Sequence, residues 1–137
     1  HLQGSALLVK REVLEKTGWF DESFFAYCEE TDWCVRAKKS GFKLLVVPSA
    51  KIWHKQSVST GGPSSPKSLY YWTRNRLLFM KKNAPPALFI FFTVFVFPFI
   101  TLRNLWRWRG SKTHIVHLLR GIADFFHGRF GEYGYSD

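Results

Sequence analysis

The sequence predicts an α/β domain followed by membrane-associated helices, and three observations lead to this expectation. Residues 4–47 alternate short apolar runs with segments of helical spacing, an order typical of α/β domains. Residues 84–102 contain no charged side chain. Residues 113–129 place apolar side chains on one helical stripe opposite charged ones, as in a helix at a membrane interface.

Composition limits the class of protein. The chain has 137 residues, enough for one domain, and 46% apolar with 18% aromatic residues exclude a disordered chain. Twenty Lys and Arg against ten Asp and Glu leave a net charge of +10, so an acidic substrate, a phosphate-bearing ligand or an anionic membrane is an expected partner. Two cysteines are too few for a disulfide scaffold, which favours a reducing compartment over secretion.

The charges are segregated along the chain. Residues 1–32 hold seven acidic and three basic side chains, whereas residues 33–123 hold sixteen basic ones and no acidic one. The carboxylates that could do chemistry therefore gather near one end. The chain opens neither on Met nor on a signal peptide, so we expect residues before His1.

Local patterns predict the individual elements. Gly18 and Gly41 each follow a helical pattern and suit its C-terminal end. The aromatic and acidic residues of 19–27 have no clean period and predict an ordered loop, while the Ser, Gly and Pro-rich residues 56–67 predict a mobile loop or lid. The remaining expected elements, in chain order, are a strand at 4–9, helices at 10–17 and 29–40, strands at 42–47 and 51–54, and a helix at 68–82.

The uncharged segment 84–102 predicts a membrane association. As a helix its 19 residues would reach about 28 Å, close to the thickness of a hydrocarbon core. Lys81 and Lys82 precede it and a basic, Trp-rich belt at 103–109 follows it. A buried core helix or a pair of strands is the alternative, and a re-entrant segment bent at Pro98 is another.

Three carboxylates, those of Glu29, Glu30 and Asp32, lie within four residues at an expected helix start. Capping is the simple interpretation, because a helix N-terminus attracts negative charge. Helical spacing places Glu30 on the apolar side with Cys34, while Asp32 can pair with Arg36 four residues on. A carboxylate on an apolar side beside like charges has a raised pKa, the property of a general base near neutral pH.

Other polar side chains give weaker indications. His54, at the end of an expected strand, could ligate a divalent metal or be a structural histidine; with two cysteines it lacks the spacing of a zinc site. Arg74 and Arg76 are candidate diphosphate contacts or helix-surface charges. Further candidates for a substrate pocket are Asp21 and five aromatic residues, for which core packing is the alternative. The aromatic ones are Trp19, Phe24, Phe25, Tyr27 and Trp33.

A long ordered set of residues resembles glycosyltransferase family 2. It comprises Gly18-Trp-Phe-Asp-Glu-Ser-Phe-Phe-Ala-Tyr-Cys-Glu-Glu-Thr-Asp-Trp-Cys-Val-Arg-Ala37, then Gly41, Pro48, His54 and the run Tyr70-Tyr-Trp-Thr-Arg-Asn-Arg76. These positions are similar to the acceptor half of the GT-A enzymes of that family, especially rhamnosyltransferase-like bacterial members. The resemblance implies that residues 1–83 form the acceptor side of a GT-A domain. The uncharged run and the apolar stripe predict a transmembrane or re-entrant segment at 84–110 and an interfacial helix and tail at 111–137.

The resemblance also implies roles for individual residues. Glu30 matches the carboxylate that deprotonates the acceptor hydroxyl, although Asp is commoner there, and Asp32 would organise the acceptor site or hold Arg36. His54 matches a histidine that helps to bind a divalent metal, Mg²⁺ or Mn²⁺, with the nucleotide diphosphate. No Asp-x-Asp motif occurs in this chain. The resemblance therefore implies that these residues are the C-terminal part of an enzyme whose nucleotide-binding half lies outside them.

The expected function is therefore part of an inverting hexosyl- or rhamnosyltransferase of bacterial cell-surface polysaccharide synthesis. Its expected partners are a nucleotide-diphosphate sugar, a glycan or lipid-linked acceptor and the inner membrane, with the catalytic side cytoplasmic. One rival is a non-catalytic basic module that binds anionic lipid or a polyanion, and another is an inactive scaffold descended from such an enzyme. The acidic cluster argues against a nucleic-acid partner, because a polyanion binder has no use for three carboxylates beside aromatic residues.

Overall fold

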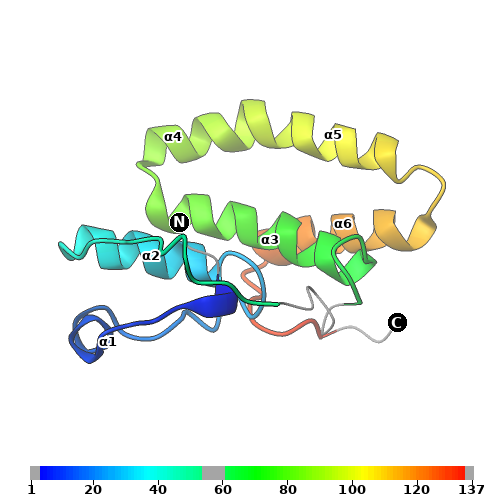
Figure 1. Ribbon diagram of the computed structural model, residues 1–137. Helices are drawn as coiled ribbons and strands as arrows, with labels where there is room; N and C mark the ends of the chain where they lie inside the picture. Colours follow the sequence, from blue (N-terminus) through cyan, green and yellow to red (C-terminus); the bar gives the residue numbers. More distant parts are fainter. Residues whose placement is uncertain (1–3, 54–60, 135–137) are drawn as a thin grey trace.

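The computed structural model describes residues 4–53 and 61–134 of the chain (Figure 1). Within these residues the regular structure is helical and no β-strand is present. The elements in chain order are η1 (Gly4–Ala6), α1 (Arg11–Thr17), α2 (Glu29–Lys39), α3 (Pro66–Asn83), α4 (Pro86–Phe91), the π-helical η3 (Phe92–Val96), α5 (Phe97–Arg107) and α6 (Lys112–Phe126).

The helix boundaries follow from local signals in the sequence. Gly18 ends α1 with φ 72°, and its N–H donates to the carbonyl of Leu14 at 2.8 Å. Gly41, at φ 92°, follows the end of α2 in the same left-handed region. Ser65 caps α3 by accepting a bond from the N–H of Ser68, and Pro66 occupies the first turn. The helices expected at 10–17, 29–40, 68–82 and 113–129 are thereby confirmed within a few residues.

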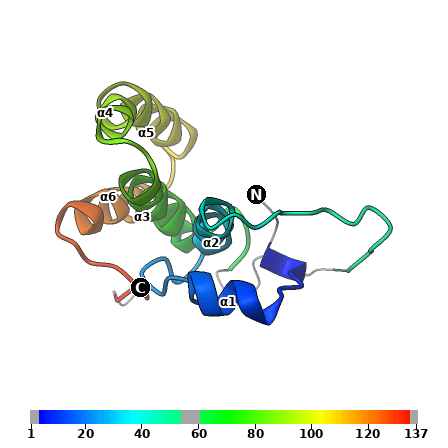
Figure 2. The same cartoon turned by 90° about the vertical axis from the view of Figure 1, so that its left-hand side faces the viewer.

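Helix α3 is the central element of the molecule. Its most extensive packing is against α6, and the end-on view in Figure 2 places it between α6 and α2. One apolar cluster joins the loop before α2 to α3, α5 and α6 through Phe24, Cys28, Leu77, Leu78, Phe97 and Phe125. A second cluster joins α1 to α2 through Val13, Trp33, Cys34 and Ala37. The loop and helix that carry the acidic cluster are therefore fixed from both sides.

The strands expected at 4–9 and 42–47 are wrong for the described structure. Residues 4–6 form a short 3₁₀ helix, and residues 42–47 are extended but form no strand. The side chains of Leu45, Val46 and Val47 are 73%, 74% and 62% exposed, and the segment projects away from the helices (Figure 2). β-branched residues suit a strand only when a neighbouring strand takes up their backbone bonds, and the described part of the chain offers none. The strand expected at 51–54 is likewise absent from its described residues, 51–53, and His54 lies outside the described residues. Of the lid expected at 56–67, residues 56–60 also lie outside them, whereas 61–67 form turns and the start of α3.

The uncharged segment is a helix as expected, and the alternative of a pair of strands is wrong for it. α4, η3 and α5 form a 22-residue helix, Pro86–Arg107, that is long and apolar enough to cross a membrane and is 6% buried over its most apolar window. It runs back above α3 (Figure 1). The π-helical turn lies directly before Pro98, whose ring has no N–H and cannot fit a regular turn. The helix therefore passes Pro98 without breaking.

Candidate functional site

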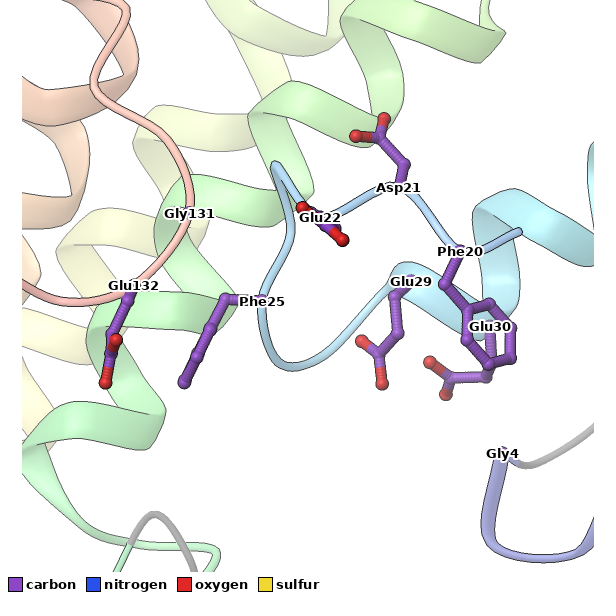
Figure 3. A pocket seen from close by; sticks show the side chains of 9 residues that line it. All are labelled: Gly4, Phe20, Asp21, Glu22, Phe25, Glu29, Glu30, Gly131 and Glu132. Carbon is purple, nitrogen blue, oxygen red and sulfur yellow. The ribbon is translucent and has the colours of Figure 1, made fainter. Parts of the chain in front are cut away.

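A pocket of about 550 Å³ lies where the loop before α2, the start of α2, η1 and the C-terminal tail meet. This volume is in the range of small-molecule sites. Among its described lining residues, five carry carboxylates and two are aromatic (Figure 3). The lining consists of Gly4, Phe20, Asp21, Glu22, Phe25, Glu29, Glu30, Gly131 and Glu132.

Glu29 and Glu30, the first two residues of α2, form a carboxylate pair in this pocket (Figure 3). Burial, the largest cause, and the neighbouring Glu30 carboxylate raise the pKa of Glu29 to about 7, against a hydrogen bond from its own backbone that lowers it. The Oε2 atom of each residue is buried and accepts no hydrogen bond from the described part of the chain. The helical pattern selects Glu30 as the candidate base; in the structure Glu29, whose pKa is raised, lies beside it in the same pocket.

Asp32, the third carboxylate, does not line the pocket. It is 1% exposed, and its Oδ2 accepts from Arg36 Nε at 2.9 Å while its Oδ1 accepts from Asn83 Nδ2 at 2.8 Å. The expected pairing with Arg36 is confirmed. Arg36 also donates to the carbonyls of Thr17 and Trp19. Asp32 therefore ties α2 to the end of α1 and to the end of α3.

Asp21 lies at the pocket and forms an ion pair with Lys82 of α3. Burial acts to raise the pKa of Asp21, but the bonds from Lys82 and Ser23 outweigh it and hold the pKa below its usual value. In Figure 3 its carboxylate points away from those of Glu29 and Glu30. Asp21 thus anchors the loop to α3 at the edge of the pocket.

The aromatic candidates separate by position. Trp33 is buried, and its Nε1 donates to the carbonyl of Gly18 at 2.9 Å, so it belongs to the core. The hydroxyl of Tyr27 bonds to Ser68 Oγ at 2.8 Å and its ring packs on Trp72. Trp19 is 76% exposed and is absent from the pocket lining. The aromatic side chains that do line the pocket are Phe20 and Phe25.

The two arginine candidates lie away from the pocket. Arg74 is fully buried, and its donors reach protein oxygen atoms, so it presents no guanidinium to a ligand in this structure. Arg76 is half-buried on α3, where burial lowers its pKa. His54, the metal-ligand candidate, lies outside the described residues.

Metal and thiol chemistry find little support in the described residues. Within 4–53 and 61–134 no group of three His, Cys, Asp or Glu side chains could hold a metal ion. Burial, with the Glu30 carboxylate nearby, raises the pKa of the Cys28 thiol to about 12, which keeps it protonated and unreactive. The carboxylate pair is therefore the chemically distinctive feature of the pocket.

The pocket also contains residues that the sequence argument did not select. Phe20, Glu22 and Glu132 line it, and the last comes from the tail after α6. The tail is held there by the N–H of Gly131, which donates to the carbonyl of Ser23 at 2.9 Å. The return of acidic residues after the acid-free stretch, at Asp124 and Glu132, is the signal that could have indicated this contribution.

Comparison with known proteins shows relatives that transfer sugars. The chain is 30% identical over 129 residues to the dTDP-rhamnosyl transferase RfbF of Shigella flexneri, an alignment that covers 86% of this chain and 44% of that protein. It is 43% identical over 60 residues, 44% of this chain, to an N-acetylglucosaminyl-diphospho-decaprenol L-rhamnosyltransferase of Mycobacterium tuberculosis, covering 20% of it. This chain is homologous to glycosyltransferases over part of their length.

A third relative broadens the range of transferred sugars. The low-salt glycan biosynthesis hexosyltransferase Agl10 of Haloferax volcanii is 32% identical over 78 residues, 57% of this chain and 25% of that protein. The chain thus spans less than half the length of these curated relatives. No protein-family model matches the chain. No solved structure matches it either.

Proposed function

We propose that this chain is the acceptor-side part of an inverting glycosyltransferase that builds a cell-surface glycan from a nucleotide-diphosphate sugar. The observation that carries the proposal is the carboxylate pair Glu29 and Glu30 in a pocket whose volume lies in the range of small-molecule sites. The homology to rhamnosyl- and hexosyltransferases supports the reaction class.

The proposed chemistry needs one group that takes a proton. In an inverting transfer, a base removes the proton of an acceptor hydroxyl as its oxygen attacks the anomeric carbon, and the bond from that carbon to the diphosphate breaks. Glu30 is our candidate base, because it matches the carboxylate that acts as the base in the family that this chain resembles. A pKa of about 7 at Glu29 means that the pair readily holds one proton near neutral pH.

The charge of the pocket favours the acceptor over the donor. Its described lining carries five carboxylates, and Lys82, the ammonium beside it, is paired with Asp21. A diphosphate would be repelled there, whereas the hydroxyl groups of a neutral sugar can donate to carboxylates. The rings of Phe20 and Phe25 offer apolar surface to the same ligand.

We also propose that the enzyme uses a divalent metal, Mg²⁺ or Mn²⁺, because His54 matches a histidine that helps to bind the metal in the family that this chain resembles. The described residues supply no metal-binding cluster, so no step is assigned to the ion here. We expect His54→Ala in the complete protein to raise the metal concentration needed for activity. A metal titration identical to that of the unmodified protein would return His54 to a structural role.

A membrane surface is the proposed location, on its cytoplasmic side where nucleotide sugars are made. Exposed apolar side chains cover the outer face of the long helix, and a basic Trp-rich belt follows it. Helix α6 adds exposed Val116, Leu119 and Phe126. These faces suit a position close to a lipid-linked acceptor.

Two matched substitutions test the catalytic proposal. We expect Glu30→Gln in the complete protein to lower turnover about 100-fold or more while nucleotide binding is kept, because a general base contributes rate and not donor affinity. Glu29→Gln is the control of equal size in the same pocket. Turnover within a few-fold of the unmodified protein for Glu30→Gln, with loss for Glu29→Gln, would move the base to Glu29.

The same experiment decides against the rival interpretations. Sugar transfer that survives both substitutions would remove this pocket from the chemistry. No transfer by the complete unmodified protein, together with binding to anionic vesicles, would favour the inactive scaffold or the basic lipid-binding module.

A further inference from the structure

The polar core between α3 and the loop at 21–28 takes no part in the proposed chemistry, yet it is fully buried. Arg74 and Asn75 are consecutive residues in the middle of α3, and both are 0% exposed. A buried guanidinium and a buried amide are stable only when their N–H groups find acceptors. Here the acceptors belong to the loop that leads into the carboxylate pair.

The two side chains bind the backbone of the loop rather than its side chains. Asn75 Nδ2 lies 2.6 to 2.9 Å from three carbonyl oxygen atoms. Arg74 Nη2 lies 3.1 and 3.2 Å from two. The carbonyls contacted by one side chain or both are those of Ser23, Phe24, Ala26 and Tyr27.

A chain of bonds fixes the orientation of the Asn75 amide. Arg74 Nε donates to Asn75 Oδ1 at 3.0 Å, which turns the Nδ2 group toward the loop. Arg74 Nη1 in turn donates to the hydroxyl of Tyr70 at 3.1 Å, and that hydroxyl donates to Asp124 Oδ2 at 2.8 Å. The rings of Tyr70 and Tyr71 flank the guanidinium. These bonds therefore fix the orientation of the Arg74 and Asn75 side chains toward the loop.

The loop needs such support because its backbone is strained. Phe25, Tyr27 and Cys28 have φ values of 59°, 64° and 74°, a region that non-glycine residues rarely adopt. Cys28 is the last residue before α2, and its carbonyl accepts the first bond of that helix, from the N–H of Asp32 at 2.8 Å. Glu29 and Glu30 follow immediately, so the conformation of the loop determines how α2 begins and how its first two side chains are oriented.

We propose that Arg74 and Asn75 are positioning residues of the carboxylate pocket, which hold the left-handed loop in place and thereby aim Glu29 and Glu30. They touch neither a substrate nor the reacting atoms. The catalytic consequence rests on the proposed function, whereas the geometric consequence for Glu29 does not.

The test replaces Asn75 by a residue of similar size without donors. In Asn75→Leu the loop carbonyls lose their partner, so we expect the loop to relax and Glu29 to become more exposed. The pKa of Glu29, followed by NMR titration of its carboxyl carbon, should fall from about 7 toward its ordinary 4.5. Four other carboxylates line the same pocket, so their titrations must be followed alongside that of Glu29 in both proteins. They are those of Asp21, Glu22, Glu30 and Glu132.

Activity of the complete protein provides the second readout. We expect kcat to fall about 100-fold, the effect of a small misplacement of reacting groups, while the KM for the donor is unchanged. Thr73→Val is the matched control, because Thr73 is also buried on α3 but its hydroxyl donates within the helix, to the carbonyl of Leu69. Arg74→Lys is a second variant, which keeps the charge but loses the planar guanidinium with its several N–H donors. We expect it to lower kcat and the pKa of Glu29 as well.

Several outcomes would overturn the proposal. One is a Glu29 pKa and a kcat in Asn75→Leu that match those of Thr73→Val, and another is failure of both Asn75→Leu and Arg74→Lys to fold, since the pair would then serve the whole fold. An unmodified protein without transfer activity would refute the proposed function instead, and the Glu29 titration alone would then decide the positioning role.

Discussion

Glu29 and Glu30 are adjacent in the chain and line the same pocket, although helical spacing selects only Glu30 for the apolar side of α2. Spacing marks which residues share a face of α2, and it assigned Glu30 to the apolar side. The burial of Glu29 is produced by segments far away in sequence, since η1 and the tail at Gly131 and Glu132 close the pocket. Proton affinity is therefore a property of the assembled site and not of the helix alone.

The raised pKa of Glu29 predicts a specific dependence of stability on pH. A folded-state pKa of about 7 against an ordinary 4.5 means that the folded state binds this proton more tightly. Its contribution to stability is fully present below about pH 4.5 and is lost as the pH rises through about 7. Between pH 4.5 and about 7, the free energy of unfolding of Glu29→Gln should therefore fall less than that of the unmodified chain. Urea denaturation at the two ends of the interval measures the difference, and equal losses in the two proteins would contradict it.

Asp32 is predicted to act on stability rather than on chemistry. Asp32→Asn removes a charged acceptor from Arg36 while keeping the shape of the side chain, and hydrogen bonds to charged groups contribute about 1.5–3 kcal/mol. We expect the free energy of unfolding to fall by about 1–2 kcal/mol, since Arg36 remains 30% exposed. The kcat of the folded fraction should be unchanged. A large loss of kcat at full stability would instead give Asp32 a role in the acceptor site.

At the scale of elements, α3 organises the molecule because it contacts the loop, α2, α4 and α6. Its contact with α6 is close enough to require a residue without a side chain. A Cβ atom added at Gly121 would lie 2.7 Å from the carbonyl oxygen of Tyr70 and 3.3 Å from Thr73 Cβ. The close contact lies next to Arg74, so the packing of α6 also supports the residues that hold the loop.

Gly121→Ala is therefore predicted to destabilise the chain. Alanine gains about 1 kcal/mol over glycine in helix propensity. A clash with backbone outweighs that gain, since overpacking costs about 1–3 kcal/mol and a carbonyl cannot rotate away as a side chain can. Gly110→Ala is the control, because nothing lies within 4 Å of a Cβ built there. Thermal denaturation compares the two, and a melting temperature for Gly121→Ala at or above that of Gly110→Ala would contradict the expectation.

In the molecule as a whole, the acidic pocket and the apolar face of the long helix are formed by separate elements. The pocket is built by η1, the loop, the start of α2 and the tail, whereas a large group of exposed apolar side chains lies on Pro86–Arg107 and α6. Figure 1 shows the long helix on the far side of α3 from α1. The arrangement is consistent with our proposal that the long helix and α6 contact a membrane while the pocket receives the acceptor.

A vesicle-flotation assay tests this membrane face. Phe95 and Phe99 are 66% and 71% exposed on the long helix, so Phe95→Asp with Phe99→Asp should abolish binding to anionic vesicles. Leu45→Asp is the control, because Leu45 is 73% exposed but lies on the extended segment. We expect binding by the control to persist at high salt, since apolar insertion is not screened. Binding that high salt removes would indicate a purely electrostatic contact.

The helices follow from local sequence, because caps, spacing and uncharged runs act over a few residues and need no distant partner. The acidic cluster and the pairing of Asp32 with Arg36 are equally local, since they lie within one helical turn. The folded structure was needed to show that residues 42–47 pair with no strand in the described part of the chain, since a strand exists only beside another strand. It alone also decided that Arg74 is buried under the loop and that Glu29 has the raised pKa, because burial is created by segments that meet only after folding.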